Sequence, residues 1–193
     1  MNIAARYTKT LLLLAAVAGS AHAQGIRYGF QFGPSQPQAD LKRAKFVIGV
    51  TVGLSINVDL GRGHTLRPRL DYSDWPGDES FGWGGPTTKA RAYGLGADYL
   101  YHLSGDAKGF YLLAGLGYQN SSLVDRNTYR ISRPDDWKHF GSGNSAFYAL
   151  GLGRQHNDLF GTELRYTASK PAIGGVDMQF NTLNLAFTFR WGR

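Results

Sequence analysis

From Gly25 onward, apolar and polar residues alternate with a period of two, and this pattern restricts the possible folds more than any other feature of the sequence. Successive side chains of a β-strand point to opposite faces, so the alternation predicts strands that each have one apolar face. Eight segments follow the pattern, at residues 25–33, 48–58, 66–72, 93–102, 112–119, 148–153, 163–167 and 182–191. Pro68 weakens the prediction of a strand at 66–72, because proline offers no N–H to a strand ladder.

The segments between these strands alternate between short and long. Short turns are expected at residues 61–63, 104–109 and 157–158, whereas longer connections are expected at 34–45, 74–89, 120–145 and 170–177. In an antiparallel meander this alternation places all the long loops at one end and all the short turns at the other. The sequence therefore predicts an all-β fold, an eight-stranded antiparallel up-and-down transmembrane β-barrel with both chain ends on the short-turn side.

The residue types on the two faces indicate that the apolar face meets lipid. The polar face is rich in glycine, which makes room for larger neighbours inside a narrow barrel. Aromatic residues lie near the strand ends on the apolar face, where membrane barrels carry aromatic girdles. A soluble barrel of the lipocalin type, with its apolar face inward, is the alternative. The girdle candidates are Tyr28, Phe32, Tyr72, Tyr101, Tyr118, Phe189 and Trp191.

Charges of both signs also occupy the polar face. Buried charges must be paired, so we expect an internal network of ion pairs. The pairs Glu163 with Arg165, and Arg67 with Arg69 and Asp71, share a face because they are spaced by two residues. Such a network either plugs the lumen permanently or acts as a gate for small ions. The expected interior charges are Arg27, Arg67, Arg69, Asp71, Asp98, Glu163, Arg165 and Arg190.

The N-terminal residues predict export. Residues 1–23 combine Arg6 and Lys9, an apolar run at 11–18, and Ala21-His22-Ala23, which together are typical of a cleaved signal peptide. The barrel domain is then expected at residues 24–193. An N-terminal membrane anchor is the alternative, although the apolar run is too short to span a bilayer.

Composition excludes several classes of function. The chain has no cysteine, so thiol chemistry, disulfides and cysteine metal sites are excluded. Its net charge of +7 comes from scattered residues and not from a basic block, which argues against nucleic-acid binding. The histidines are too far apart in sequence to indicate a metal site. We expect no cofactor.

The whole predicted barrel resembles the small eight-stranded outer-membrane barrels, namely the OmpA-type transmembrane domain and its OmpX-like relatives. The last strand also resembles the outer-membrane assembly signal, through Asn184, Phe189 and Trp191. It differs from that signal at Ala186, where glycine is usual, and by continuing to Gly192 and Arg193. The resemblance implies an outer-membrane location in a Gram-negative bacterium, periplasmic termini and contact with the assembly machinery.

Some barrels of this size modify lipid A, using histidine and serine near the outer rim. Here His64, His102 and His156 adjoin short turns, and only His139 lies in a long loop. The His-x-Ser arrangement of the deacylases is absent, because the seventh strand reads Arg165-Tyr166-Thr167. The repeated Gly-Leu-Gly steps lack the third glycine of a dinucleotide-binding motif. We therefore predict that the protein is not an enzyme.

The expected role is structural or surface interaction, in adhesion or envelope integrity, through the loops at 74–89 and 120–145. Aromatic and arginine residues on rigid scaffolds are common in recognition surfaces. Alternatives are a small passive pore gated by the internal ion pairs, and a lipid A-modifying enzyme. Expected partners are outer-membrane lipids, lipopolysaccharide and an extracellular ligand, bound by a monomer. The recognition candidates are Trp83, Arg126, Arg130, Arg133 and Trp137, with Trp75 as a further loop aromatic.

Overall fold

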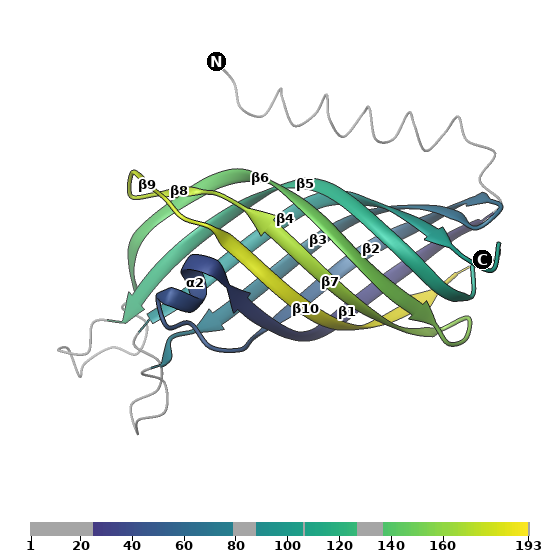
Figure 1. Cartoon of the computed structure of the whole chain (residues 1–193), viewed down its shortest axis with the longest axis horizontal. Helices are drawn as coiled ribbons and strands as arrows, with labels where there is room; N and C mark the ends of the chain where they lie inside the picture. Colours follow the sequence, from purple (N-terminus) through teal and green to yellow (C-terminus); the bar gives the residue numbers. More distant parts are fainter. Residues whose placement is uncertain (1–24, 79–87, 106, 127–136, 193) are drawn as a thin grey trace, which may run out of the picture.

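In a computed structural model of the chain, residues 25–78, 88–105, 107–126 and 137–192 are described. The predicted signal peptide at 1–23 lies outside these residues. Eight strands form a closed antiparallel barrel in the order β1-β10-β7-β6-β5-β4-β3-β2, which confirms the predicted fold class (Figure 1). The strands are β1 (Gly25–Gln38), β2 (Gly49–Gly61), β3 (His64–Pro76), β4 (Thr88–His102), β5 (Gly109–Arg126), β6 (Trp137–Gln155), β7 (Phe160–Ser169) and β10 (Phe180–Trp191).

The barrel closes where the first strand meets the last. Tyr28 on β1 is the register partner of Trp191 on β10, and Gln38 is the partner of Asn181 at the other end of the seam. Pro68 is accommodated within β3, where it faces Ala97 on the outer side. Every barrel strand therefore has two neighbours, so the wall is continuous around the molecule.

The outer surface of the barrel is apolar. The alternation predicted for Gly25 onward is present, with the apolar residue of each pair outside and the polar residue buried. Leu116, on the outer face, is 72% exposed, a value that suits a lipid-facing position. The outward set includes Ile26, Tyr28, Phe32, Leu54, Ile56, Leu70, Tyr93, Leu95, Tyr101, Leu112, Tyr118, Leu150, Leu152, Leu185 and Trp191.

Glycines on the inner face make space for large side chains. A Cβ added to Gly96 would lie 2.7 Å from the Phe147 ring, and one added to Gly153 would overlap the Tyr111 ring. Phe147 and Tyr111 are both buried in the lumen. Eight strands enclose an interior just wide enough to be filled by side chains, so each large ring requires a small residue opposite it.

Two predicted loops are shorter than expected, because the strands continue past the apolar belt. The predicted loop at 120–145 is wrong at both ends, since β5 reaches Arg126 and β6 begins at Trp137. Similarly, β3 extends to Pro76 and β4 begins at Thr88, inside the predicted loop at 74–89. Many residues of these extensions are polar or glycine, with Trp75, Leu123 and Val124 among the apolar exceptions, so the alternation is lost. Ladder hydrogen bonds form without an alternating apolar face. Register is maintained to the Arg126–Trp137 pair, with a bulge next to Val124.

The other two long connections contain small elements that fold over the same end of the barrel. Between β1 and β2 lies helix α2 (Ala39–Arg43), and between β7 and β10 lies the hairpin of β8 (Ala172–Ile173) and β9 (Val176–Asp177). Figure 1 shows both at the end opposite the C-terminus. Both fall within connections predicted as loops at 34–45 and 170–177. No helix in the described ranges has the length and hydropathy to cross a bilayer.

Candidate functional site in the barrel lumen

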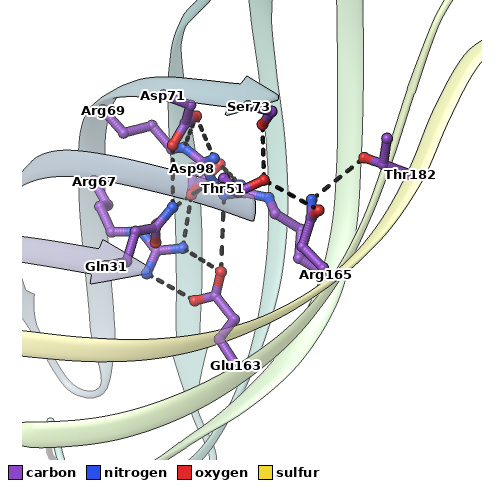
Figure 2. A network of polar contacts seen from close by, with 11 residues as sticks. Gln31, Thr51, Arg67, Arg69, Asp71, Ser73, Asp98, Glu163, Arg165 and Thr182 are labelled. Atoms are coloured by element: carbon purple, nitrogen blue, oxygen red, sulfur yellow. Dashed lines mark hydrogen bonds and ion pairs between the residues drawn. The ribbon is translucent and has the colours of Figure 1, made fainter. Parts of the chain in front are cut away.

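A balanced network of charges occupies the middle of the lumen (Figure 2). Asp98 on β4 is its centre, because it contacts Arg67 and Arg69 from β3 and Arg165 from β7. Arg67 Nη2 lies 2.8 Å from Asp98 Oδ2, and Arg69 Nη1 lies 3.3 Å from the same oxygen. Asp98 is only 1% exposed. One buried carboxylate is therefore shared by three guanidinium groups.

Two further carboxylates complete the network. Glu163 on β7 accepts from Arg67, with 2.8 Å between Oε2 and Nη1, and from the Tyr111 hydroxyl at 2.9 Å. Asp71 pairs with Arg69 and accepts from Gln31 Nε2 at 3.1 Å. The network contains three arginines and three acidic residues, so its formal charge is zero. Buried ion pairs require such mutual compensation, since each isolated charge would be costly to desolvate.

The sequence pattern placed eight charged side chains in the lumen, and the structure joins six of them. Arg27 and Arg190 have no carboxylate of a described residue within ion-pair distance, so the predicted pairing is wrong for these two. Arg190 instead lies over the Tyr111 ring, with 5.6 Å between Cζ and the ring centroid. Arg27 and Arg190 lack an acidic partner because the three carboxylates of the network already pair with the other three arginines.

His102 adjoins a short turn, as the sequence indicated, but its side chain points into the lumen. It is fully buried beside Tyr111, with 5.1 Å between the ring centroids. His64 and His156 lie at the turn end as expected, and they contact Tyr99 and Thr162. Among the described residues, no group of three His, Asp or Glu side chains is arranged to hold a metal ion.

A small polar layer lies next to the ion pairs, on the side of the loop end. Thr51 and Ser73 share a hydrogen bond of 2.7 Å, and Gln119 donates to Ser169 at 2.7 Å. A cavity of about 30 Å³ at this level is lined by residues of the network, of the polar layer and of the loop end, including Asp71, Ser73 and Trp75. That volume holds one or two water molecules.

An apolar cap closes the loop end. Trp75 was predicted to be a loop aromatic, but this is wrong, because its ring is buried in the lumen and Nε1 donates to Ser35 Oγ at 2.8 Å. Helix α2 contributes Leu41 and the β8–β9 hairpin contributes Ile173. The apolar cap consists of Leu41, Phe46, Trp75, Ala90, Ala92, Ile173 and Phe180.

Polar contacts hold the two covering elements in place. Asp40 on α2 accepts from the backbone N–H of Gln179 at 2.9 Å, which ties the helix to the segment that follows the hairpin. At the base of the hairpin, the Lys170 Nζ lies 2.9 Å from the Asp177 carboxylate. This hydrogen bond raises the pKa of Lys170 above its usual value.

Side chains of the described residues occupy the lumen at three levels, which are the ion-pair network, the polar layer and the apolar cap.

The loop recognition candidates are only partly located. Trp83, Arg130 and Arg133 lie outside the described residues. Arg126 and Trp137 are register partners at the outermost described pair of β5 and β6. At the other end of the barrel, Phe189 and Trp191 of the assembly-signal pattern lie on the outer face, whereas Asn184 points into the lumen.

Some contributors to the lumen could not be found by looking for charge. Tyr111 lies one residue before the predicted fifth strand, and extending the alternation by one position would have placed it inside. Leu41 and Phe46 belong to an irregular segment with no strand period, so the sequence carries no comparable signal for the apolar cap.

A closed antiparallel barrel with a lipid-compatible exterior and a side-chain-filled lumen defines a membrane-spanning β-barrel of the outer-membrane type. The chain matches the outer membrane protein beta-barrel domain family over residues 10–190, and it belongs to this family. Outer-membrane proteins of Gram-negative bacteria make up this family and its structural neighbours, and the outer membrane is accordingly the location of this protein.

Solved structures of small outer-membrane barrels have the same fold. The N-terminal barrel domain of Pseudomonas aeruginosa OprF shares 14% identity over 87% of this chain and 100% of that chain, with a TM-score of 0.56. Ail, the attachment invasion locus protein of Yersinia pestis, shares 14% over 86% and 98%, with a TM-score of 0.57. Neisserial surface protein A shares 11% over 87% and 97%, with a TM-score of 0.55. Among curated proteins, none matches this chain.

Proposed function

We propose that this protein is a non-enzymatic, non-conducting barrel whose role is surface interaction, with the long-loop end outside the cell and both termini in the periplasm. The observation that carries the proposal is the projection of β5 and β6 beyond the apolar belt. On strands β3 to β6, the last apolar row of outward residues is Leu70, Leu95, Tyr118 and Ala146. The next row is Tyr72, Tyr93, Asn120 and Asn144, and it marks the upper edge of the belt.

From that row onward, β5 and β6 continue as a paired ribbon, formed by residues 120–126 and 137–144. Its inner side is covered at Gly143, where an added Cβ would meet the backbone of Ala172 on β8. Its β7 side is different, because the pairing of β6 with β7 begins only at Phe147. In the described part of the chain, no strand pairs with this edge of the ribbon.

An unpaired strand edge can accept an extended segment of another protein through main-chain hydrogen bonds. The ribbon therefore projects beyond the apolar belt and offers a strand edge for binding, whereas the filled lumen provides no path for solutes. The name of Ail, a structural neighbour, refers to attachment and invasion. That name is compatible with a surface role for this chain.

Outer-membrane lipids are the second set of partners that we propose. On the outer wall above the belt, Arg91 Nε lies 3.1 Å from Asp74 Oδ2, and Tyr72 donates to the same oxygen at 3.0 Å. Lys42, Arg43 and Lys45 are exposed around α2 at the same end. Cations at this level suit the phosphates of lipopolysaccharide. We also propose that Phe189 and Trp191, on the outer face of β10, form part of the signal that the assembly machinery recognises.

The alternatives have less support. A gated pore requires the network to rearrange and the apolar cap to open, since both occupy the lumen. A lipid A enzyme requires histidine together with serine at the outer rim. His64, His102 and His156 lie near the turn end, whereas His139 on β6 lies at the loop end, opposite Val124 in the register. The His-x-Ser arrangement of the deacylases is absent from the seventh strand, which reads Arg165-Tyr166-Thr167.

The ribbon edge can be tested by adding charge to it, because lysine blocks edge pairing. Asn144→Lys changes an outward residue on the free-edge strand. Asn120→Lys is the matched control, because Asn120 is its register partner and hydrogen-bond partner, at 2.7 Å, on a strand paired on both sides. Cells that express each variant are assayed for adhesion to cultured epithelial cells. We expect Asn144→Lys to lose adhesion and Asn120→Lys to retain it. Equal adhesion by both variants would contradict the edge as the binding surface.

A further inference from the structure

The outer wall of the barrel carries an exposed arginine on its turn side. On the outward faces of the described strands, Lys89 and Arg91 lie toward the loop end, and Arg154 on β6 is the one lysine or arginine on the turn side. No carboxylate of a described residue lies within ion-pair distance of Arg154. A cation in this position can pair with an anion that the surroundings supply.

Arg154 lies where the apolar belt ends on β6. The outward residues between Asn144 and Arg154 are all apolar or aromatic, namely Ala146, Tyr148, Leu150 and Leu152. At about 3.3 Å per residue and a strand tilt of about 40°, the stretch from Asn144 to Arg154 spans about 25 Å along the barrel axis, the height of the apolar band of outer-membrane barrels. Arg154 is therefore at the level of lipid headgroups.

An aromatic ring positions the guanidinium group of Arg154. Phe110 is its register partner on β5, and Arg154 Cζ lies 5.1 Å from the centroid of the Phe110 ring. This contact between a cation and a ring is favourable and restricts where the side chain lies. The ring offers no oxygen acceptor, so the N–H donors of Arg154 stay available to an oxyanion.

On its other side, Arg154 has a hydroxyl group as its neighbour. Thr162 is its register partner on β7, and the two side chains share the outer face. His156 Nε2 lies 3.0 Å from Thr162 Oγ1, and the His156 ring stacks on Phe160 with 5.4 Å between the centroids. When His156 Nε2 carries the proton, it donates to Thr162 Oγ1 and leaves the hydroxyl hydrogen free for another acceptor.

We propose that Arg154 binds the phosphate group of a membrane phospholipid, with the Thr162 hydroxyl as a second donor. Guanidinium groups recognise phosphate oxygens through paired N–H donors. The acyl chains then lie along an exposed aliphatic row of register partners, formed by Leu112, Leu152 and Leu164. The proposed periplasmic orientation of the turn end places this level in the phospholipid leaflet, and the site makes no use of the ribbon.

The test is native mass spectrometry of the refolded barrel, released from a non-ionic detergent with added phosphatidylglycerol or with diacylglycerol of the same chains. Arg154→Gln removes the charge from the site. Arg62→Gln is the matched control, because it makes the same charge change at the same end, in the turn between β2 and β3 on the opposite side of the barrel. We expect saturable binding of phosphatidylglycerol, weakened about tenfold by Arg154→Gln and unchanged in Arg62→Gln. Diacylglycerol, which lacks the phosphate, should bind weakly and equally to all three proteins.

Phe110→Leu is a second variant of the same site, because it removes the ring beside the guanidinium and keeps an apolar side chain. It should weaken phosphatidylglycerol binding about threefold, and it provides the test if Arg154→Gln does not fold. Equal binding by the wild-type protein and Arg154→Gln, equal weakening by Arg62→Gln, or diacylglycerol binding as tight as that of phosphatidylglycerol would overturn the proposal. Adhesion through the ribbon is measured separately, so either proposal can fail alone.

Discussion

At the scale of single residues, Asp98 has the most demanding role in the molecule. It contacts three arginines from two strands while being almost completely buried. Removing one partner of a buried ion pair is more harmful than replacing the whole pair, because the remaining charges have no compensation. The network therefore fixes the relative position of β3, β4 and β7 from inside the barrel.

We predict that Asp98→Asn lowers the free energy of unfolding by about 3–5 kcal/mol, since it leaves three guanidinium groups with too few acceptors. Urea unfolding followed by tryptophan fluorescence measures the change. Asp74→Asn is the control, because Asp74 pairs with Arg91 on the outer wall and should cost only about 0.2–1 kcal/mol. Equal losses in the two variants would show that burial of the network adds nothing.

Gly153 allows a second prediction at this scale. Gly153→Ala should cost about 1–3 kcal/mol, because the new methyl group overlaps the Tyr111 ring. The same substitution in a Tyr111→Leu background should cost much less. A double-mutant cycle of unfolding free energies measures this coupling. If the losses of unfolding free energy are additive, the Tyr111 ring is not the reason why a glycine is required at position 153.

Which charged side chains enter the lumen could be predicted from the sequence, but their partners could not. The period of two gives the face for Arg67, Asp98 and Glu163, and all three point inward. The choice of partner depends on the register between strands and on the distance across the barrel, which join Arg67 to Glu163 over 96 residues of sequence. The same information decides that Arg27 and Arg190 have no acidic partner.

At the scale of elements, the loop end is built from pieces that are too small to be stable alone. Helix α2 has five residues, and an isolated helix of that length does not persist in water. It is held because Leu41 enters the apolar cap and Asp40 accepts from the Gln179 backbone. The strand period could not reveal α2, the β8–β9 hairpin or the ribbon, because their structure depends on tertiary contacts and on ladder pairing between polar segments.

We predict that Leu41→Ala lowers the free energy of unfolding by about 2–5 kcal/mol, because Leu41 is fully buried in the apolar cap. Lys42→Ala, the exposed neighbour on the same helix, should change it by no more than about 0.5 kcal/mol. Both values come from the same urea titration. If the two variants behave alike, α2 does not stabilise the barrel.

At the scale of the whole molecule, the barrel is closed at its wall and filled inside. Its fold, compartment and outward face could all be predicted from alternation and loop lengths, because closure and lipid contact impose those patterns on every strand. Its ligands could not be predicted, since a period of two gives the face of a side chain and not the molecule that it binds.

We predict that the purified barrel shows no steady conductance in planar bilayers, and that Glu163→Ala shows none either. The apolar cap remains in place in this variant, so disturbing the network alone opens no path. Migration on a detergent gel before and after boiling verifies that each sample is folded, since a closed barrel resists the detergent. Conductance steps that appear only in Glu163→Ala would instead support the gated pore.

The seam between β1 and β10 has a consequence for how the protein is made. Its register pairs join residues near the start of the barrel to residues near its end, as in Tyr28 with Trp191. The wall cannot close until the last strand has been synthesised and exported. A chain truncated before Phe180 would keep two open edges, on β1 and β7. Only a complete chain can therefore close the barrel. An unfinished chain keeps unpaired strand edges, which favour aggregation and cleavage by periplasmic proteases.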